Sequence, residues 1–285
     1  MYQKQDWEIS FEVFPPKTEK GLESLFHTAG QLAQHNPCFI SGTYGAGGAV
    51  QDKGRDKTLC MLDTIRSRFN VPVTAHFTCV GNTVEAIRAW LHQATLLGIE
   101  NIMALRGDPP QGHTEFVPTP GGLRYASELV GLIRREFPHF GIGVAGYPES
   151  HRESPSRESD LLTLKHKVDQ GADAIYTQLF FDNDDFLRFR DRATALGIQV
   201  PIIPGILPVL SLSQVQRITA LCASKLTDRL WERLKSHEGD ADAQIQVGID
   251  YAAEQSRALL KEGVPGVHYY VLNRSDTIRR ILETL

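Results

Sequence analysis

The segment GIENIMALRGD, residues 98–108, contains the kind of junction that decides the fold. Gly98 ends a stretch of helical periodicity, and the chain then enters a short apolar strand, Glu100–Leu105, that closes in Arg106. A glycine at that place supplies the left-handed cap that terminates a helix. Because the strand follows the helix so closely, the segment predicts one unit of a strand–helix repeat.

The same order of helix, glycine and strand recurs at Gly171, Gly197 and Gly263. Eight strands are predicted in all, each followed by a helix, over residues 8–14, 39–45, 73–80, 100–105, 142–147, 174–181, 200–207 and 267–272. Strands that alternate with helices indicate right-handed βαβ units and a parallel sheet. Eight units favour an α/β fold of the closed (β/α)8 TIM-barrel type, and an open doubly wound sheet is the alternative.

Two or three additional helices are predicted between strands seven and eight, over Ser211–Glu262, with a polar break at His237–Asp240. Local signals also predict where helices begin. Thr18 and the pair Asn82 and Glu85 have the residue types of helix starts. Two further caps are predicted, at Asp182 or Asn183 and at Ser275.

Size and composition exclude several classes of protein. A length of 285 residues suits one barrel domain over residues 1–285, and no linker or repeat divides the chain. The net charge of −4, from 30 basic and 34 acidic side chains, argues against a nucleic-acid partner or an anionic membrane surface. No apolar run approaches the roughly 18 residues that cross a bilayer. The polar start of the chain does not resemble a signal peptide, and four scattered cysteines predict reduced thiols in a cytoplasmic protein.

Glu12 is the most informative single residue. It lies in the strand EISFEVF (Glu8–Phe14), where Ile9, Phe11 and Val13 alternate with the other side chains, and two prolines follow. A carboxylate among apolar side chains is costly unless it is paired or has a function. The alternative is a strand glutamate that faces water or forms a salt bridge.

Polar residues at the other strand ends favour a functional role for Glu12. Active sites of such barrels lie where the carboxyl ends of the strands meet the following loops. Ionisable or hydrogen-bonding side chains are predicted at seven of the eight ends: Glu12, Thr43, Tyr44, His76, Thr78, Arg106, Asp108, Tyr147, His151, Thr177, Gln178, Asn273 and Arg274. A barrel with only a structural role would not need so many of them.

Weaker signals leave alternatives open. Gly45–Gly48 superficially resembles a phosphate loop, but it lacks G-x-G-x-x-G and the Walker lysine, so a close approach of backbone to a ligand is the preferred interpretation. His76 and Cys79 could be metal ligands, but a strand histidine that is hydrogen-bonded or faces a ligand is the preferred interpretation, and no metal site is predicted. Asp108 could pair with Arg106 or act in a site. By pattern alone, Lys165–Lys167 is a solvated helix face.

An ordered set of motifs resembles the methylenetetrahydrofolate reductase family, and it is most similar to the short bacterial form with a catalytic barrel alone. The motifs cover nearly the whole chain: SFEVFPP (10–16), TYGAGG (43–48), ALRGD (104–108), GYPESH (146–151), TQLFFD (177–182), PGILP (204–208) and LNR (272–274). The loop after Gly48 is a few residues longer than the family pattern, over Ala49–Gly54.

The resemblance implies a flavin-dependent enzyme. FAD takes a hydride from NADH or NADPH, and the reduced flavin then converts 5,10-methylenetetrahydrofolate to 5-methyltetrahydrofolate in a ping-pong reaction of one-carbon metabolism that supplies methionine. Glu12 matches the general acid, and its apolar surroundings are expected to raise its pKa to about 6–7. Asp108 matches a catalytic aspartate close to both flavin and pterin. A homo-oligomer is also expected.

The resemblance further implies a set of contacts to each ligand. The positions that match flavin contacts are Tyr44, Ala46, His76, Arg106, Gly107, Asp108, Ala126, Tyr147, His151, Asp160 and Lys167, with Thr43 near the nicotinamide donor. The positions that match folate contacts are Glu12, Asp108, Gln178, Gln214 and Arg274. Two alternatives stay open: a cofactor-free barrel lyase or aldolase that uses Glu12 as a base, and a non-catalytic barrel that binds flavin or folate.

Overall fold

The structure is a computed structural model that describes residues 7–44, 51–52, 55–109 and 116–285. Its main sheet has nine parallel strands in the order β10-β11-β1-β2-β5-β6-β7-β8-β9. The strands are β1 (Glu8–Val13), β2 (Phe39–Gly42), β5 (Val73–Thr78), β6 (Asn101–Leu105), β7 (Gly141–Gly146), β8 (Ala174–Thr177), β9 (Ile202–Ile203), β10 (Gly205–Ile206) and β11 (Gly266–Tyr270).

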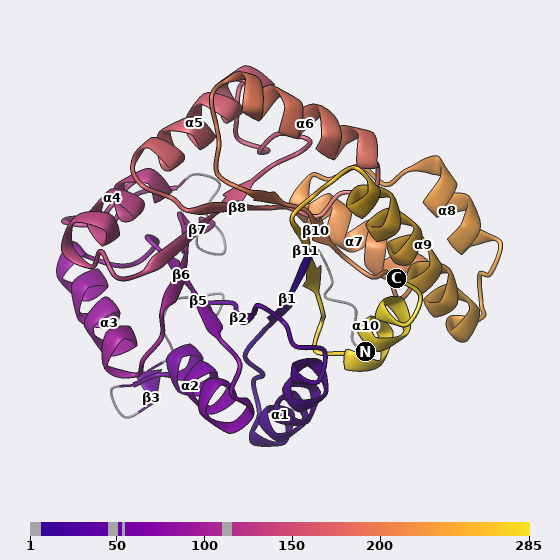
Figure 1. Ribbon diagram of the computed structural model, residues 1–285, viewed down its shortest axis with the longest axis horizontal. Helices are drawn as coiled ribbons and strands as arrows, with labels where there is room; N and C mark the ends of the chain where they lie inside the picture. Colours follow the sequence, from indigo (N-terminus) through magenta and orange to yellow (C-terminus); the bar gives the residue numbers. More distant parts are fainter. Residues whose placement is uncertain (1–6, 45–50, 53–54, 110–115) are drawn as a thin grey trace.

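Only Pro204 separates β9 from β10, so these two segments are halves of the seventh predicted strand. Proline has no N–H to contribute to a ladder. The first half, β9, pairs with β8, and the second half, β10, pairs with β11. The sheet therefore nearly closes into a barrel, and the predicted TIM-barrel fold is confirmed (Figure 1).

Helices form a ring outside the sheet (Figure 1). The ring contains α1 (Glu19–Ala33), α2 (Lys57–Phe69), α3 (Val84–Leu96), α4 (Ala126–Glu136), α5 (Arg157–Asp169), α6 (Asn183–Ala195) and α10 (Ser275–Leu282). Three more helices, α7 (Leu212–Cys222), α8 (Asp228–Lys235) and α9 (Ala241–Lys261), lie between β10 and β11. The predicted extra helices and the break at residues 237–240 are thus confirmed.

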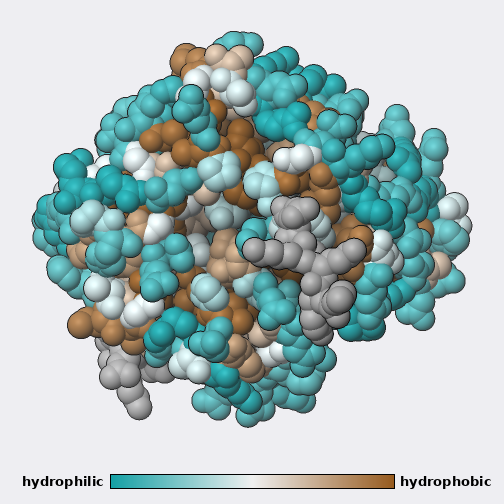
Figure 2. Space-filling view, viewed as in Figure 1, coloured by the Kyte–Doolittle hydropathy of each residue, from teal (hydrophilic) through white to brown (hydrophobic). Residues whose placement is uncertain are grey.

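The core fills the space between the sheet and this ring. Phe11, Phe77 and Phe140 are among its largest fully buried side chains, and a second apolar cluster around Val215 and Tyr251 joins α7 to α9. Figure 2 shows the outer rim as mostly hydrophilic, with hydrophobic side chains gathered nearer the barrel axis. No helix in the described ranges is both long enough and apolar enough to span a membrane.

The predicted helix stops are confirmed, because Gly98, Gly171, Gly197 and Gly263 all have positive φ, at +67°, +113°, +83° and +77°. The predicted caps at Thr18 and Asp182 are also confirmed. Two predicted caps are wrong. Thr83, not Asn82, caps α3, because the Asn82 amide donates instead to the carbonyls of Thr78 and Val80.

The second wrong cap is Ser275, which is already the first residue of α10 and donates its hydroxyl to Gln31. Strand ends also differ from prediction. The strand predicted over residues 174–181 ends at Thr177, and the one predicted over 39–45 ends at Gly42. A two-residue hairpin, β3 (Gln51–Asp52) with β4 (Arg55–Asp56), was not predicted.

Candidate active site

A cavity of about 450 Å³ contains Glu12 near the carboxyl end of β1. Side chains from several strands and from α7 line it. The polar ones include Glu12, His76, Tyr176, Gln178, His268 and Tyr270, and the apolar ones include Phe14, Met103, Leu105, Leu207, Ile218, Leu221 and Leu272. A carboxylate with two histidines in a mostly apolar cavity can bind a planar organic ligand and exchange a proton with it.

Glu12 faces two histidines. Its Oε2 lies 3.5 Å from His76 Nε2 and 3.7 Å from His268 Nε2. Both rings are buried, and the Glu12 side chain keeps 19% of its surface exposed. The other nitrogen of the His268 ring is also engaged, because Nδ1 lies within hydrogen-bond distance of Ser10 Oγ, at 2.7 Å. The structure therefore places Glu12 beside a buried histidine whose other ring nitrogen contacts a buried serine.

The expectation that the pKa of Glu12 is raised is wrong for this structure. Burial does raise it, but the polar contact with His268 and the charges of His76 and His268 outweigh burial, and the pKa lies below its ordinary value. The pKa of His76 is itself lowered, chiefly by burial. His76 is therefore neutral near pH 7.

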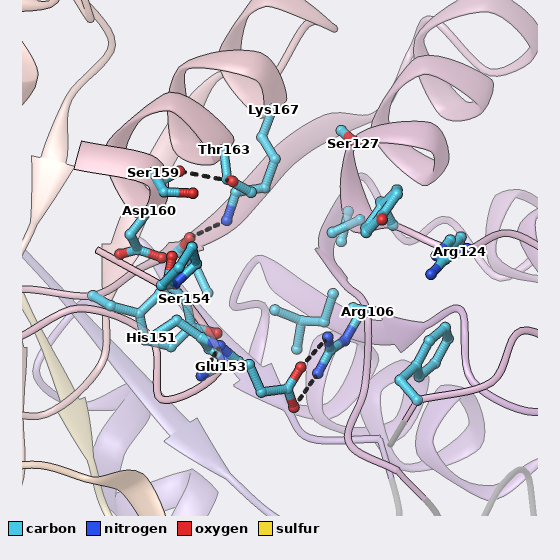
Figure 3. A pocket seen from close by; sticks show the side chains of 18 residues that line it. Arg106, Arg124, Ser127, His151, Glu153, Ser154, Ser159, Asp160, Thr163 and Lys167 are labelled. Atoms are coloured by element: carbon cyan, nitrogen blue, oxygen red, sulfur yellow. Dashed lines mark hydrogen bonds and ion pairs between the residues drawn. The ribbon is translucent and has the colours of Figure 1, made fainter. Parts of the chain in front are cut away.

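A second cavity, of about 560 Å³, adjoins the first and is more polar (Figure 3). Leu105, Ala145 and Tyr147 line both cavities, so the two spaces meet at the ends of β6 and β7. Charged side chains from four segments face the second cavity: Arg106, Arg124, Glu153, Asp160 and Lys167. A ligand that occupies both cavities needs one charged part and one apolar part.

Lys167 lies on the wall of the second cavity and is only 8% exposed. Its Nζ donates to the Ala145 carbonyl at 2.5 Å and lies 5.9 Å from the centre of the Tyr147 ring. Burial lowers the pKa of Lys167 to about 8, although the negative charge of Asp160 opposes the shift. The pattern-based interpretation of Lys167 as part of a solvated helix face is therefore wrong.

Asp160 and His151 complete the same wall. Burial raises the pKa of Asp160 against the effect of Lys167 and of a hydrogen bond from the His151 backbone. The His151 ring packs on Tyr147 with 4.7 Å between centres, and its Nδ1 accepts a hydrogen bond from the Glu153 N–H at 3.2 Å. Burial and the Arg106 charge lower the pKa of His151, which keeps the ring neutral and able to accept.

Arg106 forms its ion pair with Glu153, not with Asp108. The two guanidinium nitrogens lie 2.6 and 2.9 Å from the Glu153 carboxylate, as Figure 3 shows. The guanidinium also lies 5.0 Å from the centre of the Phe116 ring. This arrangement contradicts the alternative of a pair between Arg106 and Asp108, and it leaves the Asp108 side chain exposed.

Asp108 still acts on both cavities through its charge. Burial chiefly raises the pKa of Tyr147, and the charges of Asp160 and Asp108 add to the shift. Burial and then Asp108 raise the pKa of Cys222, which lines the Glu12 cavity. Asp108 therefore lies within electrostatic reach of the place where the two cavities meet.

The structure brings nine of the sixteen predicted site residues to the walls of the cavities. Glu12, His76, Tyr147 and Gln178 line the first, and Arg106, Ala126, Tyr147, His151, Asp160 and Lys167 line the second. Gly107 sits between Arg106 and Asp108 with φ +87°, and a Cβ there would lie 2.5 Å from Val80 Cγ1.

The other predicted residues do not line either cavity. The Tyr44 ring packs on Phe77 and Trp90, and Thr43 precedes it at the end of β2. Gln214 accepts a hydrogen bond from the Leu210 N–H at 2.9 Å in the first turn of α7. Arg274 is exposed before α10, and Ala46 lies outside the described residues.

Sequence reasoning missed His268, Tyr176 and Tyr270. A signal was available for two of them, because Ser10 pairs with His268 and Glu12 pairs with Tyr270 in the register of β1 and β11. Alternate residues of neighbouring parallel strands share one face. Glu153 and Arg124 were also missed, since loop residues have no such period. Within the described ranges, no cluster of three or more His, Cys, Asp or Glu side chains could hold a metal ion.

Comparison with known proteins identifies close relatives. The family model described as methylenetetrahydrofolate reductase matches residues 1–285. The 5,10-methylenetetrahydrofolate reductase of Escherichia coli is 38% identical over 277 residues, which cover 97% of this chain and 90% of that protein. Methylenetetrahydrofolate reductase (NADH) 1 of Zea mays is 38% identical over 97% of this chain, but the chain spans only 48% of that protein, about half its length.

Solved structures with low sequence identity share the fold. A Clostridium thermocellum protein that binds two copies of 5-methyl-5,6,7,8-tetrahydrofolic acid superposes with a TM-score of 0.64, at 15% identity over 98% of this chain and 93% of that one. A 2,3-dimethylmalate lyase superposes with a TM-score of 0.51, at 13% identity over 97% of this chain and 79% of that one. At these identities the likeness shows the barrel fold alone.

Proposed function

Because the chain belongs to the methylenetetrahydrofolate reductase family, we propose that it reduces 5,10-methylenetetrahydrofolate to 5-methyltetrahydrofolate with a bound FAD. The electron donor is NADH or NADPH, and the name of the maize relative favours NADH. The catalytic unit is one barrel over residues 1–285. A homo-oligomer, a cytoplasmic location and a role in methionine supply stay predictions.

The two adjoining cavities are the observation that carries the proposal. FAD has an anionic pyrophosphate at its centre and a planar, mostly apolar ring at one end. The second cavity offers Arg106, Arg124 and Lys167 to an anion, and the first offers an apolar space beside Glu12. Gly107 lies near the junction, where any side chain would meet Val80. The residues present therefore fit a flavin that extends through both spaces.

When bound, FAD would supply the capacity to accept a hydride from the nicotinamide and to pass it to the folate. The protein must supply a proton to the folate. The methylene bridge becomes reactive only when a ring nitrogen is protonated and the five-membered ring opens to an iminium cation. Glu12 is the acid in the apolar cavity that can give this proton.

The lowered pKa of Glu12 requires a source for that proton. His268 Nε2 faces the carboxylate, and Ser10 Oγ can donate to Nδ1 of the same ring. In that tautomer Nε2 carries the ring proton and points it towards Glu12. We therefore assign to Glu12 the transfer to folate, and to His268 the orientation of the carboxylate. The Glu12 side chain is 19% exposed, and it regains its proton from solvent.

Three further residues would act on the folate. The Asp108 charge would favour the cationic iminium electrostatically. Gln178 lines the Glu12 cavity, and its Oε1 accepts from the Leu179 N–H at 2.9 Å, so its NH₂ group remains to donate to a ligand. Arg274, exposed at the same end of the barrel, suits the glutamate carboxylates of folate.

The visible absorption spectrum tests the proposal. The purified protein, supplemented with FAD, should show a flavin band that bleaches with NADH under anaerobic conditions and returns when methylenetetrahydrofolate is added. A band that bleaches but is not restored would leave a flavin oxidoreductase with another acceptor. A protein that binds no flavin would contradict the proposal and favour a lyase that uses Glu12 as a base.

A further inference from the structure

The side chain of Asn273 acts as an additional rung between the ends of β1 and β11. The Phe14 N–H donates to Asn273 Oδ1 at 3.1 Å, and Asn273 Nδ2 donates to the Phe14 carbonyl at 3.0 Å. These two bonds join residues that are 259 positions apart. We call the line of contacts between β1 and β11 and the residues that follow them the β1–β11 seam. Its last backbone hydrogen bond runs from the Val271 N–H to the Glu12 carbonyl at 3.1 Å. The amide therefore extends the ladder directly beyond Glu12.

The backbone of β11 cannot provide this rung. Leu272 and Asn273 have φ of +51° and +55°, so the chain leaves the extended conformation immediately after Val271. Two consecutive left-handed residues are costly for side chains other than glycine, and asparagine tolerates the conformation best. On the other strand, Pro15 and Pro16 have no N–H to offer. Phe14, the first residue after β1, is thus the last residue before the prolines with an N–H, and the Asn273 side chain accepts a hydrogen bond from it.

The seam fixes the walls of the Glu12 cavity relative to each other. Phe14 and Leu272 both line that cavity, from the residue after β1 and from the turn after β11. Arg274 follows in the same turn, and its N–H donates to the Val271 carbonyl at 3.0 Å. The Thr28 hydroxyl of α1 adds a longer contact, 3.4 Å, to the Asn273 carbonyl.

We propose that Asn273 is a positioning residue that holds Glu12 and Arg274 in register for the reduction of folate. The inference rests on the proposed function, because it concerns the half-reaction that needs both residues. Oxidation of the nicotinamide donor needs neither the Glu12 proton nor the Arg274 charge. Loss of the Asn273 amide therefore slows the folate half-reaction selectively. A displacement of about 1 Å in a site can cost about 100-fold in rate.

Asn273→Gly is the decisive variant, because glycine accepts φ +55° without strain and removes only the amide. We expect FAD content and flavin reduction by NADH to stay as in the parent, and flavin reoxidation by methylenetetrahydrofolate to slow by about 10- to 100-fold. Asn273→Asp keeps the acceptor for the Phe14 N–H and loses the donor, so its rate should lie between those of the parent and Asn273→Gly. Asn273→Asp also tests the proposal if Asn273→Gly does not fold.

Asn70→Gly is the matched control. Asn70 is also left-handed, with φ +52°, but it caps α2 away from both cavities. It should leave both half-reactions unchanged. An Asn273→Gly protein that reduces folate at the parent rate, or that loses both half-reactions equally, would overturn the proposal.

Amide hydrogen exchange at Phe14 separates this proposal from the proposed function. Exchange at this amide should be faster in Asn273→Gly than in the parent, whatever reaction the protein catalyses. Unchanged protection of the Phe14 amide would refute the inference even in an active reductase. If the parent has no folate activity but Asn273→Gly still speeds exchange at the Phe14 amide, the proposed function would be refuted. The structural role of Asn273 in joining the ends of β1 and β11 would then stand.

Discussion

Ser10 Oγ lies 2.7 Å from His268 Nδ1 across the seam between β1 and β11, and both side chains are buried. The contact sets the orientation of the imidazole, because one nitrogen is engaged and the other faces Glu12 at 3.7 Å. The three side chains are brought together by strand register alone, since Ser10 and His268 are direct partners in the parallel ladder. Glu12 follows two residues later on the same face of β1.

Replacement of the proposed acid separates the two half-reactions. Glu12→Gln removes the proton but keeps the size of the side chain, so FAD binding and oxidation of the nicotinamide donor should persist. Reduction of methylenetetrahydrofolate should fall by about 10²- to 10⁴-fold, the usual contribution of a general acid. Anaerobic stopped-flow absorbance measures both steps. Folate reduction at the parent rate would remove Glu12 from the proton transfer.

The lowered pKa of Glu12 predicts the pH dependence of the folate step. At neutral pH most of the carboxyl is ionised, and its protonated fraction grows as the pH falls. The rate of flavin reoxidation by folate should therefore rise from pH 7.5 towards about pH 5.5 without the plateau that a pKa of about 6–7 would give. A plateau below neutrality would show that the pKa is raised after all.

Stability sets the lower limit of that pH range. Because the pKa of Glu12 is lower in the folded than in the unfolded protein, its ionised form stabilises the fold at pH values above the unfolded-state pKa. This stabilisation is lost as the pH falls through the pKa of the folded state. Thermal unfolding at each pH is therefore the control. His268→Gln should shift the pH profile of the folate step to higher pH, because it removes the imidazole contact and charge that hold the Glu12 pKa down.

Much of the fold followed from local sequence signals. The helix ends at Gly98 and Gly171 can each be predicted from the few residues around the glycine. Eight consecutive strand–helix units are compatible with only a few sheet topologies. Glu12 was found for a similar reason, since a carboxylate in an apolar strand is unusual whatever its neighbours. The division of the seventh strand at Pro204 was not predicted, because the strand pairs with a different neighbour on each side of the proline.

The parts that failed depend on contacts between distant segments. The direction of the Glu12 pKa shift requires His268, which is 256 residues away in sequence and adjacent only in the closed barrel. Lys167 is flanked by His166 and Val168 in a helix whose charged residues lie on several faces, so its burial cannot be read from periodicity. Residues such as Gln214 and Arg274 rest on the family resemblance, and their folate contacts stay predictions.

Asp108→Asn tests the electrostatic role. The substitution removes a charge but almost no volume, and the side chain is exposed, so the free energy of unfolding should hardly change. FAD should remain bound, whereas the folate step should slow because the cationic iminium loses its stabilising charge. Asp169→Asn on α5 is the control, because it also removes one carboxylate charge, from an exposed side chain that pairs with Lys165. Folate kinetics that match the Asp169→Asn control would make Asp108 a structural residue.

Gly107→Ala should destabilise the protein and weaken FAD binding. Alanine at φ +87° is strained, and its Cβ would meet Val80 Cγ1 at 2.5 Å. Strain and steric overlap together should lower the free energy of unfolding by about 2–4 kcal/mol. Gly81→Ala is the matched control, because Gly81 has φ +74° and open space around the position of a Cβ. Denaturant titration should show a loss of only about 1 kcal/mol for this control. Equal losses for the two variants would exclude the predicted steric overlap.

The pKa of Lys167 predicts that FAD affinity depends on pH. With the amine titrating at about 8, the protein offers a cation to an anionic ligand below that pH and loses it above. The FAD association constant should then fall by up to about tenfold per pH unit above pH 8, as proton linkage requires.

Unfolding does not explain such a loss, because Lys167 favours the folded state more as the pH rises. The unfolded chain keeps the proton between about pH 8 and the ordinary lysine value, so stability increases over that interval. Lys167→Met should bind FAD more weakly and without this pH dependence, whereas Lys165→Met, a partly exposed neighbour on the same helix, should behave as the parent. Fluorescence titration with FAD from pH 7 to 9.5 measures the affinity of the parent and of both variants. A parent affinity that is flat over this range would show that the Lys167 ammonium does not hold the cofactor.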